Sequence, residues 1–505
     1  RGVVRVVTPG TLLEANLLES KRSNYLVAVA LGDVEVGLAY ADISTGEFAA
    51  TQISSNALAA EMVRLNPSEV LLPKGASLGA VGPNDAASVP VTLVEDGWFD
   101  PEAAREYLLR RLDVASMEGY GLEGWPLAVA ACGAILRYQG ETLKSASVDL
   151  RLGAYSTSAF MALDAATRRN LELFQAGRLG LSAGALLSVL DLTETAMGGR
   201  LLRQWLGQPL LDVGEIRNRQ DMVAFFHDSA ARRALAQALL KKVGDLERLV
   251  NRARSGLATP RDLAALRQGL ETVPALKELV AGGSESLAGG LRPCREVVEL
   301  LSNALPQDPP ATLGSGEAIR LGFSPELDQL RMSSKDIRGY LASLEKQERE
   351  RTGIKSLKVG YNRVFGYYIE VTTSNLSSVP ADYIRKQTLT GAERYFTPQL
   401  KEFESSLLNA QERMVELEAD LFRQVCRQVA LAAREVLDTA AAVARLDVAA
   451  TLAEAAARHG YVRPEVDDGP AIDIKGGRHP TVESVLGEGG FVANDTYLCN
   501  KDSQL

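Results

Sequence analysis

Several features that would announce a particular chemistry are missing from this sequence. Its 505 residues include only four cysteines, which are scattered and form no CxxC pair. That spacing predicts neither a disulfide framework nor a zinc site, and it is typical of a reducing compartment. There is no run of about 18 apolar residues and no signal peptide, so we expect a cytoplasmic protein that does not enter a membrane.

The sequence also lacks the loop that holds phosphates in many nucleotide-hydrolysing enzymes. No GxxxxGKS/T pattern occurs, nor any Gly-Lys-Ser or Gly-Lys-Thr. Lys and Arg number 55 against 64 Asp and Glu, which gives a net charge of −9. This acidic balance argues against a surface that binds nucleic acid throughout, but it allows a local basic patch. A chain of this length predicts three or four domains.

The clearest β-type segment in the second half of the chain spans residues 355–398. Its strand candidates are rich in aromatic and β-branched residues, among them Val359, Tyr367, Ile369 and Val371. The segment carries six Lys or Arg residues and three Asp or Glu residues, a net charge of +3 within an acidic chain. A basic sheet with interleaved aromatics indicates a surface that touches polyanions. The alternative is an ordinary solvated hairpin, and charge alone favours that alternative.

Long helical sequence flanks this segment on both sides. Apolar positions over residues 327–344, and again over 400–421, recur at alternating spacings of three and four, which is the pattern of a heptad seam. The second helix is predicted to run from about residue 398 to 459, and roughly 60 residues would be on the order of 90 Å long. We therefore expect an antiparallel pair of helices with a small sheet at its tip.

The remaining regions differ in their periodicity. Residues 1–112 predict three strands and then helix–strand alternation, which favours one mixed sheet with helices packed on it. Residues 113–300 predict one helix after another, with Asp164 as a cap. Beyond about residue 460 the pattern returns to strands, like the opening of an α/β domain.

Several motifs, in the same order along the chain, resemble those of the MutS family of DNA mismatch-repair ATPases. The matching stretches are VVTPGT at 6–11, ADISTGEF at 41–48, LDAATRRNLE at 163–172, TAMGGRLLR at 195–203, QPL at 208–210, VGYNRVFGYYI at 359–369, RKQTLTGAERY at 385–395, GRHP at 477–480 and FVAN at 491–494. The resemblance covers nearly the whole chain and is far more specific than a single short pattern.

The resemblance implies a multidomain fold of α/β and mainly α-helical parts. An α/β connector domain precedes a helical core, long antiparallel lever helices carry a small β clamp, and an α/β ATPase domain begins without being completed. The implied boundaries are 1–112 for the connector, 113–323 for the core, 324–354 for the outgoing lever, 355–398 for the clamp, 399–459 for the returning lever and 460–505 for the start of the ATPase domain.

A clamp in this family would hold duplex DNA by its phosphates without reading its sequence. The candidates for contact lie in loops and turns of the tip: Arg363, Ser374, Asn375, Arg385, Lys386, Thr390 and Arg394. The small Thr390-Gly391 turn would let backbone N–H groups approach a phosphate. The alternative is that Arg385 and Arg394 pair with Glu393 or Asp382 and only hold the hairpin together.

The resemblance also implies a nucleotide site near the end of the chain. Phe491 would stack on adenine, Val492 would offer its backbone to the base edge, and Asn494 belongs to the same motif. The alternative is a plain strand with a core Phe. ATP or ADP with Mg²⁺ would serve the parent protein, whereas this chain, without a phosphate loop, is not expected to bind nucleotide tightly or to hydrolyse ATP by itself.

By resemblance, the parent protein would be a homodimeric, ATP-dependent sliding clamp that binds mismatched duplex DNA and recruits a MutL-type partner. An Ala/Leu/Gly-rich composition favours a bacterial source, and the resemblance implies a cytoplasmic, nucleoid-associated protein. The Phe-x-Glu wedge that reads mismatches in this family is absent, because no Phe has Glu two positions later. The alternative is therefore a DNA-encircling relative without mismatch recognition, like the meiotic members of the family.

Two further groups of polar residues have competing interpretations. Asp42, with Asp33, Glu35 and Glu47, could supply the converging carboxylates of a metal nuclease, but capping of the turn after Asp42 is favoured. Arg200 and Arg203 are interpreted as solvated or interdomain residues, and a role in coupling the levers to the ATPase stays open.

Overall fold

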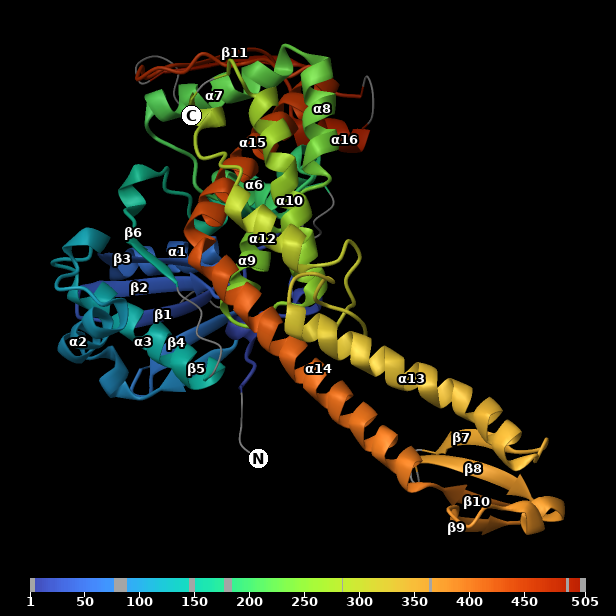
Figure 1. Cartoon of the computed structure of the whole chain (residues 1–505). Coiled ribbons are helices and arrows are strands. Elements are labelled where there is room, and N and C mark those ends of the chain that lie inside the picture. Colours follow the sequence, from blue (N-terminus) through green and yellow to red (C-terminus); the bar gives the residue numbers. More distant parts are fainter. Residues whose placement is uncertain are drawn as a thin grey trace. The chain divides into compact units, whose positions relative to one another are not determined.

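The computed structural model describes residues 5–76, 89–144, 150–176, 184–283, 285–362, 366–486 and 490–499. The chain divides into two compact units (Figure 1). The first unit comprises residues 1–258, 265–298 and 426–505, and the second comprises residues 259–264 and 299–425. In the described residues, no helix is long and apolar enough to cross a membrane.

A six-stranded mixed sheet forms the beginning of the first unit, as the sequence predicts. Its order is β5-β4-β1-β2-β3-β6, with antiparallel pairing in the meander β1-β2-β3 and parallel pairing elsewhere. The strands are β1 (Leu26–Leu31), β2 (Glu35–Asp42), β3 (Glu47–Ser54), β4 (Glu69–Pro73), β5 (Val91–Val94) and β6 (Arg151–Ala154).

Helices cover both faces of this sheet, because β1, β2 and β4 are apolar on both sides. One face packs against α1 (Leu58–Leu65). The other packs against α2 (Pro101–Leu112) and α3 (Pro126–Leu143). At Gly37 of β2, an added Cβ would overlap the carbonyl of Leu127, so glycine is required where α3 crosses the strand.

The predicted end of the α/β domain at residue 112 is too early. Helix α3 was predicted as a helix but assigned to the helical core, whereas its buried face packs on the sheet. Strand β6 then pairs in parallel with β3 and forms one edge of the sheet, so the α/β domain extends to Ala154. The reason for the difference is that a run of apolar residues predicts a helix without indicating which partner it covers.

A helical domain follows within the same unit. Its long central helix is α15 (Ala433–His459), which is rich in alanine. Helices α6, α7, α8 and α9 pack against it. The other helices are α4 (Ala165–Asn170), α5 (Leu186–Leu190), α6 (Ala196–Gly207), α7 (Val213–His227), α8 (Ala230–Leu240), α9 (Leu246–Arg254), α10 (Pro260–Leu279), α11 (Glu285–Ala288) and α12 (Arg295–Ala304), of which α10 and α12 also extend into the second unit. The predicted cap at Asp164 is confirmed, since its carboxylate accepts the Thr167 N–H at 2.7 Å.

The last part of the first unit is a two-stranded antiparallel ribbon. Strand β11 (Ile472–Gly477) pairs with β12 (Asn494–Leu498), and α16 (Pro480–Leu486) lies between them in sequence. Both strands are exposed along most of their length. The predicted return to β structure is therefore confirmed.

The second unit contains two long helices and a four-stranded sheet. Helix α13 (Pro325–Thr352) precedes the sheet, and α14 (Pro398–Leu431) follows it and continues into the first unit. The strands are β7 (Lys358–Asn362), β8 (Gly366–Thr372), β9 (Ile384–Leu389) and β10 (Ala392–Phe396). The single helix predicted over 398–459 is instead two helices, α14 and α15, which are separated by Ala432 alone.

Candidate nucleic-acid interface

The basic segment folds as an antiparallel sheet in the order β7-β8-β10-β9. Successive side chains of a strand point to opposite faces. One face holds Ile369, Val371 and Tyr395, which form a buried cluster with Leu344 of α13 and Leu407 of α14. The rings of Tyr340 and Phe403 join the two helices beside this cluster, with centroids 4.2 Å apart. The two helices therefore cover this face of the sheet.

A row of polar side chains crosses the other face of the sheet. The cross-strand register aligns Lys358 with Glu370, Glu370 with Arg394, and Arg394 with Gln387. Aligned neighbours on one face lie within reach of each other. Opposite charges therefore alternate along the row, and each charge stabilises the next.

Arg394 is the most constrained cation of this row. Its Nε donates to Glu370 Oε2 at 3.0 Å, its Nη1 donates to Gln387 Oε1 at 3.2 Å, and its guanidinium lies 4.0 Å from the Tyr368 ring centroid. Its side chain is only 20% exposed. These contacts fit the alternative in which Arg394 supports the sheet, although its partner is Glu370 rather than Glu393 or Asp382. Asp382 instead pairs with Arg351.

Lys386 lies at an irregularity of the edge strand β9. Arg394 pairs with Gln387 and Tyr395 pairs with Arg385, so Lys386 is an extra residue between two cross-strand pairs. Such a β-bulge bends the strand and redirects a side chain. The Lys386 Nζ lies 5.3 Å from the Phe396 ring centroid.

A second lysine reaches the same aromatic ring. Lys401, in the first turn of α14, places its Nζ 5.6 Å from the Phe396 centroid. A ring face attracts cations, and the ammonium groups of Lys386 and Lys401 both lie beside this ring. Sequence analysis missed Lys401 because it lies just beyond the strand-rich segment, in the helical heptad pattern.

Among the predicted contact residues, Arg385 is far more exposed than Arg394. It pairs with Glu393 at 3.5 Å, as the structural alternative predicted, yet 65% of its side chain is exposed. Glu393 also accepts the Tyr395 hydroxyl at 2.6 Å, and burial together with this carboxylate raises the pKa of Tyr395 to about 12. An exposed ion pair contributes little to stability, so the Arg385 guanidinium can exchange partners at small cost.

The remaining predicted residues have different surroundings. Asn375 donates to Ser356 Oγ at 2.9 Å and to Thr372 Oγ1 at 3.0 Å, and the Ser374 hydroxyl lies 3.2 Å from the same Thr372 oxygen. Thr390 and Gly391 form an exposed turn, in which Gly391 has a φ of 92°. Arg363 lies outside the described residues.

The predicted nucleotide residues lie at the start of the exposed ribbon strand β12. Phe491 is partly exposed, 78% of Val492 is exposed, and the Asn494 amide donates to the Val492 carbonyl at 2.9 Å. An aromatic face is therefore available for stacking, but this arrangement offers no cradle for phosphates. In the part of the chain that the structure describes, no cluster of carboxylate, His or Cys side chains could hold a metal ion.

Comparison with known families places these elements in context. The family model described as MutS domain II matches residues 24–155, and the one described as MutS domain III matches residues 166–453. The chain belongs to the MutS family. The match to MutS domain II ends at residue 155, directly after β6, which agrees with the sheet domain seen here. The predicted resemblance is thus confirmed.

Several curated relatives carry the name DNA mismatch repair protein MutS. The chain is 47% identical to the one from Dehalococcoides mccartyi over all of its own length and 59% of the relative. It is 45% identical to the relative from Thermosynechococcus vestitus, over 99% of this chain and 59% of the relative. It is 44% identical to the relative from Symbiobacterium thermophilum, over 98% of this chain and 58% of the relative. The chain therefore spans about three-fifths of the length of these MutS relatives.

Proposed function

We propose that this chain is the part of a DNA mismatch-repair protein that grips duplex DNA through the sheet of residues 355–398. Membership of the MutS family and the mismatch-repair name of its relatives support the general function. The positive site around Phe396, which Lys386 and Lys401 form together, is the observation that carries the assignment to this sheet.

The physical argument is the local concentration of positive charge. Both ammonium groups lie beside the Phe396 ring, and a lysine that contacts a phosphate releases a condensed counterion from the duplex. Lysine contacts of this kind hold any duplex sequence, since phosphates carry no base identity. Lys355 and Lys358 are exposed on the same sheet unit and would extend the contact. Arg394 would act indirectly, by keeping the sheet in place.

We propose further roles for the long helices, the α/β domain and the end of the chain. Helices α13 and α14, with α15, would act as levers that carry the sheet, and the α/β domain would contact a MutL-type partner. The whole protein would work as a homodimeric sliding clamp switched by ATP or ADP with Mg²⁺. Phe491 would stack on the base there, while the phosphates would need residues beyond those described.

The salt dependence of duplex binding tests the assignment. Each lost phosphate contact reduces the slope of log K against log salt by about 0.9. We expect Lys386→Ala with Lys401→Ala to reduce the slope of the chain by about 1.8. The matched control is Lys241→Ala with Lys242→Ala, which removes the same charge from an exposed site after α8. An unchanged slope in the first variant, or an equal change in the control, would contradict the proposal.

The alternative, a DNA-encircling relative without mismatch recognition, has less support. The relatives cited above are all named as mismatch-repair proteins. Affinity of the intact parent protein for a mismatched duplex against a matched one separates the two functions. Equal affinities would favour the alternative.

A further inference from the structure

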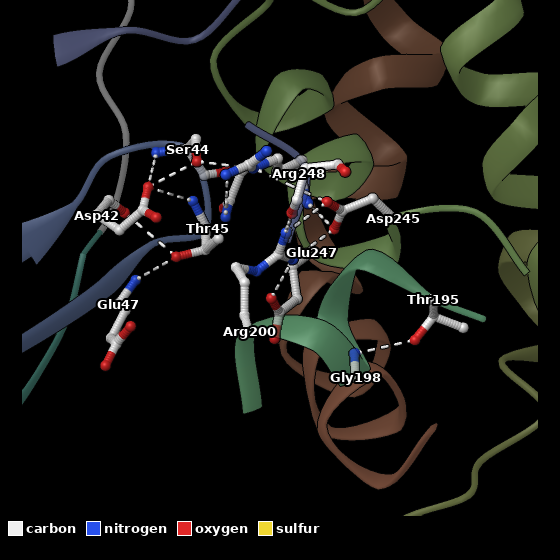
Figure 2. A network of polar contacts seen from close by, with 12 residues as sticks. Asp42, Ser44, Thr45, Glu47, Thr195, Gly198, Arg200, Asp245, Glu247 and Arg248 are labelled. Carbon is white, nitrogen blue, oxygen red and sulfur yellow. Dashed lines mark hydrogen bonds and ion pairs between the residues drawn. The ribbon is translucent and has the colours of Figure 1, made fainter. Parts of the chain in front are cut away.

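A polar network joins the α/β domain to the helical domain in the first unit (Figure 2). On the α/β side it begins at the turn between β2 and β3. Asp42 caps this turn, accepting hydrogen bonds from the Ser44 N–H at 2.9 Å, the Ser44 hydroxyl at 2.6 Å and the Thr45 N–H at 3.3 Å. The predicted capping role is confirmed. Glu35 lies at the opposite end of the same strand, so these carboxylates do not converge on a metal.

Arg248 of α9 connects this turn to the helical domain. Its Nε donates to the Ser44 hydroxyl at 3.1 Å, and its two Nη groups donate to the carbonyls of Glu19 and Arg22 at 3.1 and 2.9 Å. The side chain is 9% exposed. One turn further along, the Asn251 amide donates to the Ser44 carbonyl at 3.3 Å. A single guanidinium thus spans the β2–β3 turn and the segment that precedes β1.

Arg200 of α6 continues the network into the helical domain. It forms a bidentate pair with Asp245 at 2.7 and 2.8 Å, and it reaches Glu247 at 2.7 Å and the Ser20 carbonyl at 2.7 Å. Burial would lower the pKa of Arg200, but the two carboxylates outweigh it and hold the pKa above its usual value. The burial of Arg200 excludes the solvated interpretation, and its contact with Ser20 fits the interdomain one.

The first turn of α6 is also fixed from its other side. Asp447 of α15 accepts the Thr195 N–H at 2.8 Å and the Thr195 hydroxyl at 2.7 Å, and Thr195 caps α6 through the Gly198 N–H. A Cβ at Gly198 would overlap the Asp447 carboxylate. The order of contacts is thus α15, α6, α9 and then the β2–β3 turn.

The packing beside this network is open. A cavity of about 570 Å³ lies between the two domains, with Tyr25 and Glu47 on one wall and Met197 and Trp205 on the other. Close apolar packing does not fill this part of the boundary. The buried polar contacts therefore carry a larger share of the coupling, and they are directional and costly to leave unpaired.

We propose that Asp42, Ser44, Arg200, Asp245, Glu247 and Arg248 form a polar joint that couples the α/β domain to the helical domain. Through it the two domains unfold as one cooperative body. A displacement of α6 against α15 is passed to the β2–β3 turn, because no contact of the joint can shift without leaving a buried charge unsatisfied. The inference concerns the first unit and does not depend on DNA binding by the sheet.

The three tryptophans allow a direct test, because they lie in different domains. Trp98 and Trp125 pack against the α/β core, whereas Trp205 packs in the helical domain. In the full chain, Trp205→Phe leaves reporters for the α/β domain, and Trp98→Phe with Trp125→Phe leaves a reporter for the helical domain. We expect both backgrounds to show the same urea midpoint by fluorescence.

Arg248→Met keeps an unbranched apolar stem but removes the guanidinium. We expect the two fluorescence midpoints to separate in this variant. If Arg248→Met does not fold, Ser44→Ala removes the hydroxyl that bridges Asp42 to Arg248 and is expected to separate the midpoints by a smaller interval. Midpoints that stay coincident in the variant that folds, or that already differ in the parent chain, would overturn the proposal.

The matched control is Arg233→Met. Arg233 is similarly buried and forms an ion pair with Glu454 at 3.0 Å, entirely within the helical domain. Its loss is expected to lower both midpoints together, since the joint is intact. Separation of the midpoints in this control would show that any loss of stability uncouples the domains, and would also overturn the proposal.

Discussion

The polar joint of the first unit and the basic sheet of the second both contain arginines, but these arginines differ in their exposure. In the joint, 6% of the Arg200 side chain and 9% of the Arg248 side chain are exposed, and their hydrogen-bond acceptors are carboxylates, carbonyls and a hydroxyl of the chain itself. In the sheet, 65% of Arg385 is exposed against a single acid. Buried guanidinium groups are committed to the fold, whereas exposed ones keep their capacity for an outside anion.

The largest expected effect separates these two regions by stability. Arg200→Met removes the guanidinium that pairs with the largely buried Asp245 and Glu247, and breaking such a buried pair costs about 3–5 kcal/mol. Arg385→Met removes an exposed pair and should cost less than about 1 kcal/mol. Urea unfolding of both variants measures the difference. Equal losses would mean that exposure does not distinguish the two roles.

Substitution of Gly198, at the edge of the joint, is expected to give the next largest change in the free energy of unfolding. Gly198→Ala places a methyl group against the Asp447 carboxylate and is expected to destabilise the first unit by about 1–3 kcal/mol, as overpacking does. Gly339, inside α13, has open space around it, so Gly339→Ala should stabilise by roughly 0.5–1 kcal/mol. The signs of the two changes in the free energy of unfolding should differ. The same sign at both positions would contradict the contact at Gly198.

The pH dependence of stability provides a smaller, graded effect. Burial raises the pKa of Asp447 from 3.8 to about 6, although Thr195 and the Glu194 N–H lower it in part. Between these values the folded state binds more protons than the unfolded state, so stability falls as pH rises from about 4 to 6 and this contribution is constant above that. Asp447→Asn should reduce the slope in this window by up to about 1.4 kcal/mol per pH unit.

The exposed Asp336 of α13 supplies the control for that experiment. Asp336→Asn should leave the slope between pH 4 and 6 as it is in the parent chain. If Asp447→Asn also leaves the slope unchanged, the Asp447 carboxylate does not titrate in this window.

Much of the fold follows from local patterns in the sequence. The Gly32-Asp33 hairpin, the heptad seams of α13 and α14 and the strands of the basic sheet are set by residues close together in the chain. The edge strand β6 was missed, because its residues pair with residues of β3 that lie more than a hundred positions earlier, and no local pattern encodes that pairing. Helix α3 was found but misassigned for the same reason.

The candidate interface was predicted by residue type and corrected by geometry. Charge counting selected Arg385, Lys386 and Arg394 alike, but it could not indicate that Arg394 is held by Glu370 and Tyr368. It also missed Lys401, which comes to Phe396 only because α14 begins beside the bulged strand. The register and the bulge are tertiary features, and they decide which neighbours each cation meets.

Hydrogen exchange of the chain with and without a duplex tests the central claim most directly. If the cations around Phe396 grip DNA, amides of residues 384–401 should exchange more slowly when a matched duplex is present. Amides of α6 and α9, beside the polar joint, should be unaffected. Absence of protection in 384–401, or protection confined to the first unit, would contradict the account.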